Sequence, residues 1–323
     1  MGLPTVICSS TIRSSKQGES HGGLFVVDLN TDKVEQVFDW DDAGINWEGH
    51  GGERGLRGIC IHADKIYAAS AKKIIVFDKN FNILGKYAHP YLDQAHELDI
   101  DPITGILYIT STSYDSVISF DTNTCMFKDL YCFRSSTELT EFAGNVLFGY
   151  KRIKPEFFIC DLSNIKILEP KDTLHLNNVF YKDGAFYFSG VVLDGLYKLD
   201  LKFRILSKVC EIPVWTHNVK FYKDGIMANI TDDHRIEYIN SISKIGESYR
   251  VKKYATEEVM LAPDVIAIQC FNRGLCFHDD YIIGGSTPAT ISVYKQGEQD
   301  PIKALMLSKD IRNSIHGLEV FTK

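Results

Sequence analysis

The chain has 323 residues, of which 45% are hydrophobic and 24% charged, a composition typical of a globular protein. Its net charge of −7 is spread along the sequence, which argues against nucleic acid or an anionic membrane surface as partner. No run of about 18 apolar residues and no signal-peptide pattern occur, so we expect a cytoplasmic protein without a membrane span. The eight cysteines form no CxxC pair, which indicates free, mostly buried thiols.

Short apolar runs dominate the first forty residues. Strands are predicted at residues 6–8, 23–29 and 34–38. Residues 40–57 then form a polar, glycine-rich segment that contains His50 between glycines. Long loops of this kind in compact domains are often functional, so His50 is a candidate catalytic residue.

From Arg57 onward the chain repeats a unit of four short strands. The fragment Phe-Tyr-Lys-Asp-Gly occurs twice, at 180–184 and 221–225, and Arg57 and Arg273 each begin an Arg-Gly-aliphatic-Cys-apolar-His stretch. Units recur about every 40 residues, as in four-stranded propeller blades. The predicted units are 58–87, 97–132, 139–169, 178–212, 218–254 and 274–306. An insertion at 241–269 includes 257–263, a possible short helix or lid.

The two ends of the chain complete one further unit. The N-terminal strands lack a first strand, and residues 316–321 resemble a lone first strand. Pairing them would close the ring and remove open sheet edges. We therefore predict one domain over residues 1–323, an all-β, seven-bladed β-propeller, with six blades as the alternative because the unit after Glu138 has a weak first strand. The resemblance is to β-propellers in general, since no Trp-Asp or kelch signature occurs.

One repeat position carries polar side chains. It lies four residues upstream of the apolar residue before each turn that follows a first strand. First strands line the channel of a propeller, so these residues should converge at one mouth of it. They are Arg57, His96, Glu138, Leu176 with His175 beside it, His217, Arg273 and His316. A purely structural repeat position would be small or aliphatic.

The histidines of this ring predict a metal site. Neutral imidazoles suit iron, zinc, copper or nickel, so we expect a divalent transition metal, most simply iron, bound by His96, His175, His217 and His316. Glu97 or Glu138 would act as a further ligand or accept a hydrogen bond from a ligating imidazole. If His175 faces away from the channel, Asn177 takes its place.

The four-histidine arrangement resembles that of the carotenoid cleavage oxygenases, seven-bladed propellers whose axial iron is held by four histidines. The chain is shorter and lacks the long insertions that form their apolar tunnel, so the resemblance does not imply a carotenoid substrate. Calcium-dependent lactonase propellers use Glu, Asn and Asp instead, and Asn177, Asn178 and Asn218 keep that alternative open.

Arg57 and Arg273 complete the predicted site. Two guanidiniums at a channel mouth suit a carboxylate, phosphate or sulfate, and Asn218 and Asn177 would add polar contacts to the substrate. The sequence thus favours a metal-dependent oxygenase or lyase acting on a small anionic substrate, with Glu138, Glu97 and His50 as candidate catalytic residues. A non-catalytic ligand- or protein-binding propeller, or a calcium-dependent lactonase or lyase, is the alternative. The oligomeric state is not predicted.

Overall fold

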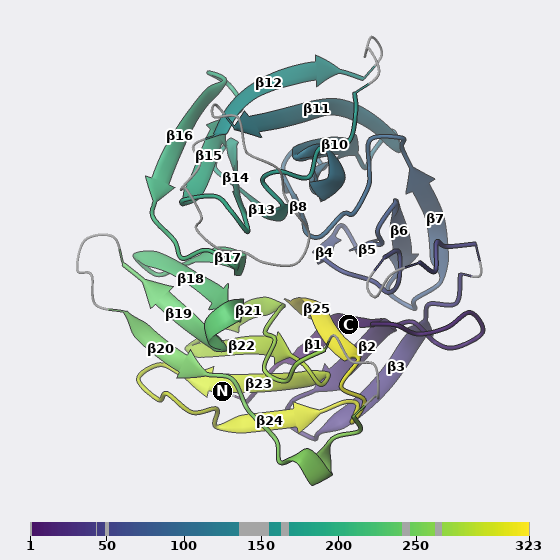
Figure 1. Ribbon diagram of the computed structural model, residues 1–323, viewed down its shortest axis with the longest axis vertical. Helices are drawn as coiled ribbons and strands as arrows, with labels where there is room; N and C mark the ends of the chain where they lie inside the picture. The colour runs from purple at the N-terminus through teal and green to yellow at the C-terminus, as the bar shows by residue number, and fades with distance from the viewer. Residues whose placement is uncertain are drawn as a thin grey trace.

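The computed structural model describes residues 2–42, 44–48, 52–135, 155–162, 168–240, 246–261 and 267–322. The chain folds into a β-propeller in which antiparallel sheets surround one axis (Figure 1). The innermost strands of neighbouring sheets contact one another around the ring, in the order β25, β4, β8, β13, β17, β21. This arrangement places the starts of the innermost strands at one mouth of the central channel and their ends at the other.

The first three blades contain the N-terminal half of the chain. Blade 1 joins the two termini through β25 (Asn313–Val320), β1 (Thr5–Ile12), β2 (Gly23–Asp28) and β3 (Lys33–Asp39). Blade 2 contains β4 (Ile59–His62), β5 (Lys65–Ala69), β6 (Lys73–Asp78) and β7 (Ile83–Ala88). Blade 3 contains β8 (Leu98–Ile100), β9 (Ile106–Ser111), β10 (Ser116–Asp121), β11 (Met126–Ser135) and β12 (Pro155–Asp161).

The other three blades have four strands each. Blade 4 contains β13 (Leu176–Lys182), β14 (Ala185–Gly190), β15 (Leu196–Asp200) and β16 (Ile205–Cys210). Blade 5 contains β17 (Thr216–Tyr222), β18 (Gly225–Ile230), β19 (Arg235–Ile239) and β20 (Glu247–Arg250). Blade 6 contains β21 (Leu275–His278), β22 (Tyr281–Ser286), β23 (Thr290–Lys295) and β24 (Lys303–Met306).

The described residues form six blades, so the preferred count of seven is wrong and the alternative is confirmed. The difference lies in the unit predicted at 139–169. Its strand at 155–161 is β12, which pairs with β11 and extends blade 3 outward instead of starting a new blade. Residues 136–154, where the first two strands of that unit were predicted, lie outside the described residues. A local strand pattern cannot distinguish a new blade from an additional outer strand, because both are apolar β-strands.

Closure of the ring by the two termini is confirmed. β25 pairs antiparallel with β1, and the register runs from Val6 opposite Val320 to Ile12 opposite Asn313. The C-terminal strand is therefore the innermost strand of blade 1, and β1 to β3 lie outside it (Figure 1). This pairing covers both edges of β1 and removes an open strand edge near the axis.

The helical content of the described residues is limited to three 3₁₀ turns, η1 (Thr112–Tyr114), η2 (Thr231–Asp233) and η3 (Thr256–Glu258). Within the insertion, η3 overlaps the predicted 257–263 segment at residues 257 and 258, and Met260 forms a bridge with Asp310. No described helix is long and apolar enough to cross a membrane. The eight cysteines are free, as expected, although Cys125 is exposed.

Apolar side chains pack mainly between neighbouring blades. One buried cluster joins Ile74 and Val76 of blade 2 to Leu107 and Ile109 of blade 3, and five further clusters occupy comparable places around the ring. Burying such faces is the main favourable term in folding. The blade cores thus supply the main contacts that hold the ring together.

Glycines allow the innermost strands to approach closely at one mouth of the channel. A Cβ on Gly317 would lie 2.5 Å from the carbonyl oxygen of Arg57 and 2.8 Å from the nitrogen of Ile59 in the next blade. A Cβ on Gly58 would lie 2.8 Å from Cα of Glu97, again in the next blade. These positions tolerate only glycine without a shift of the backbone. The close approach crowds the residues that precede the glycines, Arg57 and His316.

Candidate ligand site on the propeller axis

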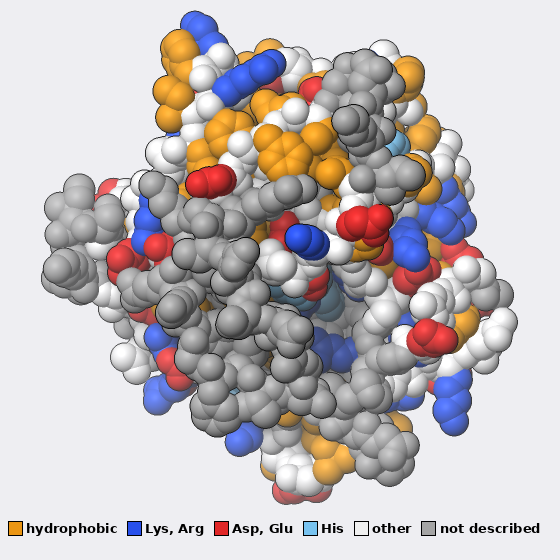
Figure 2. Space-filling model, turned by 45° about the horizontal axis from the view of Figure 1, so that its top comes forward, with side chains coloured by type: hydrophobic (Ala, Val, Ile, Leu, Met, Phe, Trp, Pro, Cys, Tyr) orange, Lys and Arg blue, Asp and Glu red, His pale blue; other side chains and the backbone are white. Residues whose placement is uncertain are grey.

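The predicted ring of polar residues is assembled at the mouth where the innermost strands begin. His217 lies in β17 and His316 in β25, whereas Arg57, His96 and Arg273 lie just before β4, β8 and β21. Histidine side chains and Lys or Arg side chains are seen together inside a hollow on one face of the molecule (Figure 2). The repeat therefore places side chains from distant parts of the sequence side by side, as the sequence analysis predicted from their register.

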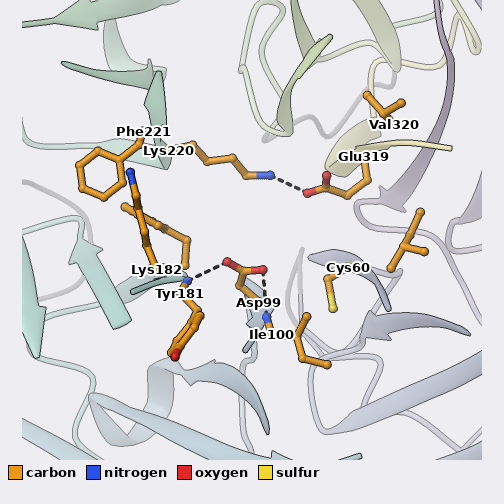
Figure 3. A pocket seen from close by; sticks show the side chains of 11 residues that line it. Cys60, Asp99, Ile100, Tyr181, Lys182, Lys220, Phe221, Glu319 and Val320 are labelled. Carbon is orange, nitrogen blue, oxygen red and sulfur yellow. Dashed lines mark hydrogen bonds and ion pairs between the residues drawn. The ribbon is translucent and has the colours of Figure 1, made fainter. Parts of the chain in front are cut away.

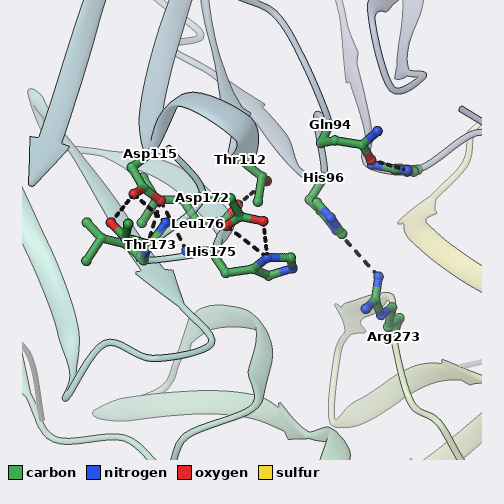
Figure 4. A network of polar contacts seen from close by, with 11 residues as sticks. Gln94, His96, Thr112, Asp115, Asp172, Thr173, His175, Leu176 and Arg273 are labelled. Carbon is green, nitrogen blue, oxygen red and sulfur yellow. Dashed lines mark hydrogen bonds and ion pairs between the residues drawn. The ribbon is translucent and has the colours of Figure 1, made fainter. Parts of the chain in front are cut away.

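Arg273 is the centre of this cluster. Its side chain is buried, with an exposed fraction of 9% for the residue. Nη1 donates to Nδ1 of His96 at 3.4 Å (Figure 4). Nη1 also donates to Nδ1 of His316 at 3.3 Å, whereas Nε has no partner among the described residues. Among the described residues, Arg273 forms no ion pair with a carboxylate. A buried guanidinium without a counterion is costly unless a ligand supplies the negative charge.

The hydrogen bonds to Arg273 fix the tautomers of two imidazoles. A guanidinium only donates, so Nδ1 of His96 and Nδ1 of His316 must each carry a lone pair. The proton of each neutral ring is then on Nε2. Both rings can therefore donate through Nε2 to an acceptor in the channel.

His217 is oriented differently from the other two rings. Its Nδ1 lies 3.2 Å from the carbonyl oxygen of Trp215 and 2.8 Å from the hydroxyl of Thr231. The carbonyl can only accept, so Nδ1 carries the proton and Nε2 carries the lone pair. Nε2 is buried and has no hydrogen-bond partner among the described residues.

Arg57 is held by the channel wall. Nη1 donates to the carbonyl oxygen of Ala95 at 2.8 Å, and Nη2 donates to the carbonyl oxygen of Gly52 at 2.8 Å and to Oε1 of Gln94 at 3.0 Å. These acceptors orient the guanidinium and leave its charge uncompensated by an ion pair within the described chain. Arg57 therefore contributes positive potential to the mouth of the channel, while Arg273 is the guanidinium with unused donors.

His175 reaches the ring although it is one residue out of register. A bulge between Leu176 and Asn178 interrupts the pairing with β14, and His175 has a positive φ of 50°. Its ring lies 5.5 Å from that of His96, between centroids, and its Nδ1 is 2.9 Å from a carboxylate oxygen of Asp172 (Figure 4). Leu176, which holds the regular position, is fully buried. The bulge thus brings the imidazole to the rim of the mouth.

Glu97 and Asn218 form the next layer of the channel. Nδ2 of Asn218 donates to Oε1 of Glu97 at 2.6 Å, and Oδ1 of Asn218 accepts from the backbone of Gly274 at 2.9 Å. Oδ1 also accepts from Asn229 at 3.0 Å, so the Asn218 amide bridges three elements. Asn177 donates to the carbonyl oxygen of Thr216 at 3.2 Å, and its Oδ1 is unpartnered. These amides tie adjacent blades together.

The structure adds Arg13 and Phe271, which the sequence analysis did not select. The guanidinium of Arg13 lies 4.7 Å from the centroid of the Phe271 ring, and that of Arg273 lies 4.8 Å from it. Neither residue occupies the repeat position, because Arg13 follows β1 and Phe271 precedes the Arg273 motif. No repeat signal marks them, although a cation–π contact explains why an aromatic side chain lies there.

Two predicted site residues lie outside the described part of the chain. Glu138 falls in the range 136–154, and His50 falls in the range 49–51. Their predicted catalytic roles are therefore not placed in space. The described side chains of the mouth are strongly basic, with three arginines and four histidines.

Burial sets the protonation of these groups. It lowers the pKa of His96, His217 and His316 well below the usual range, and the neighbouring guanidiniums lower each of them further. The three imidazoles are consequently neutral at pH 7. Burial also raises the pKa of Glu97 to about 8, so this carboxyl is mostly protonated at pH 7. A neutral Glu97 leaves the positive charge of Arg273 without an anion in contact with it among the described residues.

The four-histidine metal centre does not fit these side chains as arranged. No group of three or more His, Cys, Asp or Glu in the described residues is positioned to hold a metal ion. Nδ1 of His96 and Nδ1 of His316 already face a guanidinium, and a metal ion there would be repelled by it. His217, with Nδ1 anchored and Nε2 bare, is the one ring oriented as a metal ligand usually is. Iron binding itself stays a prediction.

The sequence matches no protein-family model and no curated protein. Among solved structures, a chain of a nidogen/laminin complex superposes with a TM-score of 0.59 at 7% identity, covering 98% of this chain and 97% of that one. The computationally designed Ika8 protein gives a TM-score of 0.49 at 10% identity, covering 100% and 92% of the two chains. U3-55K gives 0.45 at 7% identity, covering 77% and 63%. The first of these shows the β-propeller fold and nothing about function.

Proposed function

We propose that this propeller binds a small anionic molecule at the mouth of its channel formed by Arg273, His96, His316, His217 and Arg57. The observation that carries the proposal is the buried guanidinium of Arg273, which has no counterion in the described chain and has an unpartnered Nε. A carboxylate, phosphate or sulfate would accept from Arg273 and complete its hydrogen bonding.

The imidazoles support the same function. His96 and His316 present Nε2–H donors once Nδ1 accepts from Arg273. An anion between these rings would raise their pKa and favour their charged forms. The glycines that follow Arg57, Arg273 and His316 keep the mouth narrow, which suits a small ligand.

Anion binding is tested by calorimetry with phosphate, sulfate, citrate and acetate as probes, at constant ionic strength set with chloride. Arg273→Met should weaken the binding of the best probe by about 10- to 100-fold, since a hydrogen bond to a charged group contributes about 1.5–3 kcal/mol. Arg273→Lys keeps the charge but loses the planar donor pair, and should fall between Met and wild type.

Arg250→Met is the matched control, because Arg250 has a side chain that is 64% exposed and pairs with Asp300 on the surface. It should bind every probe like wild type. Equal binding by wild type and folded Arg273→Met, or no anion bound by wild type above the chloride background, would contradict the proposal.

The metal-dependent enzyme is the second candidate, favoured by the bare Nε2 of His217 alone. Metal analysis of protein produced with iron, beside His217→Ala, distinguishes the two. About one transition-metal ion per chain, lost in the variant, would support the enzyme. A metal-free protein that binds anions would support the ligand-binding propeller.

A further inference from the structure

A second site lies at the opposite mouth of the channel. A pocket of about 390 Å³ opens where the innermost strands end, and five of the six blades contribute to it. Its walls include Cys60 of β4, Asp99 of β8, Tyr181 of β13, Lys220 of β17 and Glu319 of β25 (Figure 3). The Arg273 cluster is at the starts of the same strands, so the two sites are separate.

The pocket is lined by two lysines, Lys182 and Lys220, and two carboxylates, Asp99 and Glu319, and only one pair of these is in direct contact. Lys220 and Glu319 are ion-paired across it and neutralise each other. Asp99 accepts from the backbone nitrogen of Tyr181 at 2.7 Å and from that of Ile100 at 2.9 Å, but forms no ion pair within the described chain (Figure 3). Asp99 therefore faces the pocket without a direct ion-pair partner, while the ammonium of Lys182 lies on the ring of Phe221.

Aromatic rings form the wall beside Asp99. Phe180, Tyr181 and Phe221 line the pocket, and the rings of Phe180 and Phe221 meet edge to face at 5.2 Å between centroids. The ammonium of Lys182 already lies 4.4 Å from the centroid of Phe221, which shows that this wall accepts a cation. An apolar wall beside one carboxylate that has no direct ion-pair partner is a common design of ligand pockets.

We propose that this pocket binds a small organic amine, whose ammonium group pairs with Asp99 and whose apolar body packs on Phe180 and Phe221. The ammonium would donate to the carboxylate oxygens, which have lone pairs left after the two backbone bonds. The apolar body would replace water against the rings. This proposal does not depend on anion binding at the other mouth.

The state of Asp99 predicts a pH dependence. Burial raises the pKa of Asp99 to about 6. The other titratable groups of the pocket are Lys182 and Tyr181 of β13, Lys220 of β17, Glu319 of β25 and the Cys60 thiol of β4. Amine affinity should be full above pH 7 and should fall by about tenfold for each pH unit below the pKa of Asp99. An ammonium group stays protonated throughout this range.

Benzylamine is the probe, with benzyl alcohol as its neutral match and benzoate as its anionic match, each titrated calorimetrically into the full chain. Wild type should bind benzylamine at least about tenfold more tightly than benzyl alcohol, as expected for one charge-assisted hydrogen bond. Asp99→Asn should abolish this preference and the pH dependence. Asp280→Asn, at a site whose side chain is 81% exposed, should change neither.

Arg273→Met should leave benzylamine binding unchanged, which separates this site from the anion site. Wild type that binds benzylamine no better than benzyl alcohol, or a folded Asp99→Asn variant that keeps the preference, would overturn the proposal. If Asp99→Asn does not fold, the pH titration of wild type decides: benzylamine affinity that is flat between pH 5 and 8 would equally overturn it.

Discussion

Gly317 gives the sharpest test of how closely the innermost strands pack. At Gly317, β25 lies so close to β4 that a Cβ atom would not fit between the two strands. A methyl group on Gly317 would lie 2.5 Å from the carbonyl oxygen of Arg57, 2.8 Å from the nitrogen of Ile59 and 2.9 Å from its Cγ1. Two of these three atoms are backbone, so rotation of a side chain cannot relieve the overlap.

The expected cost follows from this geometry. Overpacking of a well-packed site costs about 1–3 kcal/mol, and a clash with two backbone atoms of the neighbouring blade places Gly317→Ala at the upper end, near 3 kcal/mol. Separation of β25 from β4 would also strain the hydrogen bond from the nitrogen of Gly317 to Oγ of Ser9, which measures 2.7 Å and links blade 1 across its first two strands. Equilibrium unfolding in urea should show this loss as a lower midpoint with an unchanged slope.

Gly297→Ala is the control for this experiment. Gly297 has a φ of +84° and no atom within 4 Å of an added Cβ, so only the left-handed backbone is penalised, by about 1 kcal/mol. Gly317→Ala should therefore be clearly less stable than Gly297→Ala. If Gly317→Ala unfolds at the wild-type midpoint, the innermost strands are farther apart than described and the reasoning fails.

Three further predictions follow from the closure and the buried charges. Deletion of residues 313–323 removes the innermost strand of blade 1 and exposes an edge of β1. The truncated chain should therefore aggregate or lose its cooperative thermal transition. An unchanged melting curve would contradict the closure of the ring by the C-terminal strand. Glu97→Gln should keep the contact with Asn218 and be more stable than wild type. The difference in free energy of unfolding should grow as pH rises from 5 to 8. The reason is that the pKa of Glu97 is raised to about 8 in the folded chain, so its stabilising protonated form is lost as pH rises through that value. A margin that does not change with pH would show that the carboxyl is not so perturbed. The pKa values of His96, His217 and His316 are lowered in the folded chain, so the unfolded chain binds more protons at acidic pH. The free energy of unfolding should therefore fall as pH drops below about 6.5, and it should fall less in His316→Gln than in wild type. Equal acid sensitivity of the two proteins in urea titrations would count against buried neutral imidazoles.

The repeat in the sequence determined the fold class, the closure and the register of the axial residues. Alternating apolar residues and regularly spaced turns predict four-stranded units, because each strand must bury the faces it presents to neighbouring blades. The shared register then placed His96, His217, Arg273 and His316 at one mouth, which the structure bears out.

Only the tertiary structure decided the number of blades and the chemistry at the axis. The sequence of β12 is compatible with starting a blade and with extending one. The choice depends on which strand edge is free when the chain folds, and a local sequence pattern does not contain that information. The orientation of each imidazole depends on contacts between residues far apart in sequence, such as Nη1 of Arg273 between His96 and His316. A repeat register gives the position of a side chain but not its hydrogen-bond partners. The sequence therefore predicted both a metal and a small anion at this mouth, and the hydrogen-bond partners of Arg273 support the anion binding that we propose.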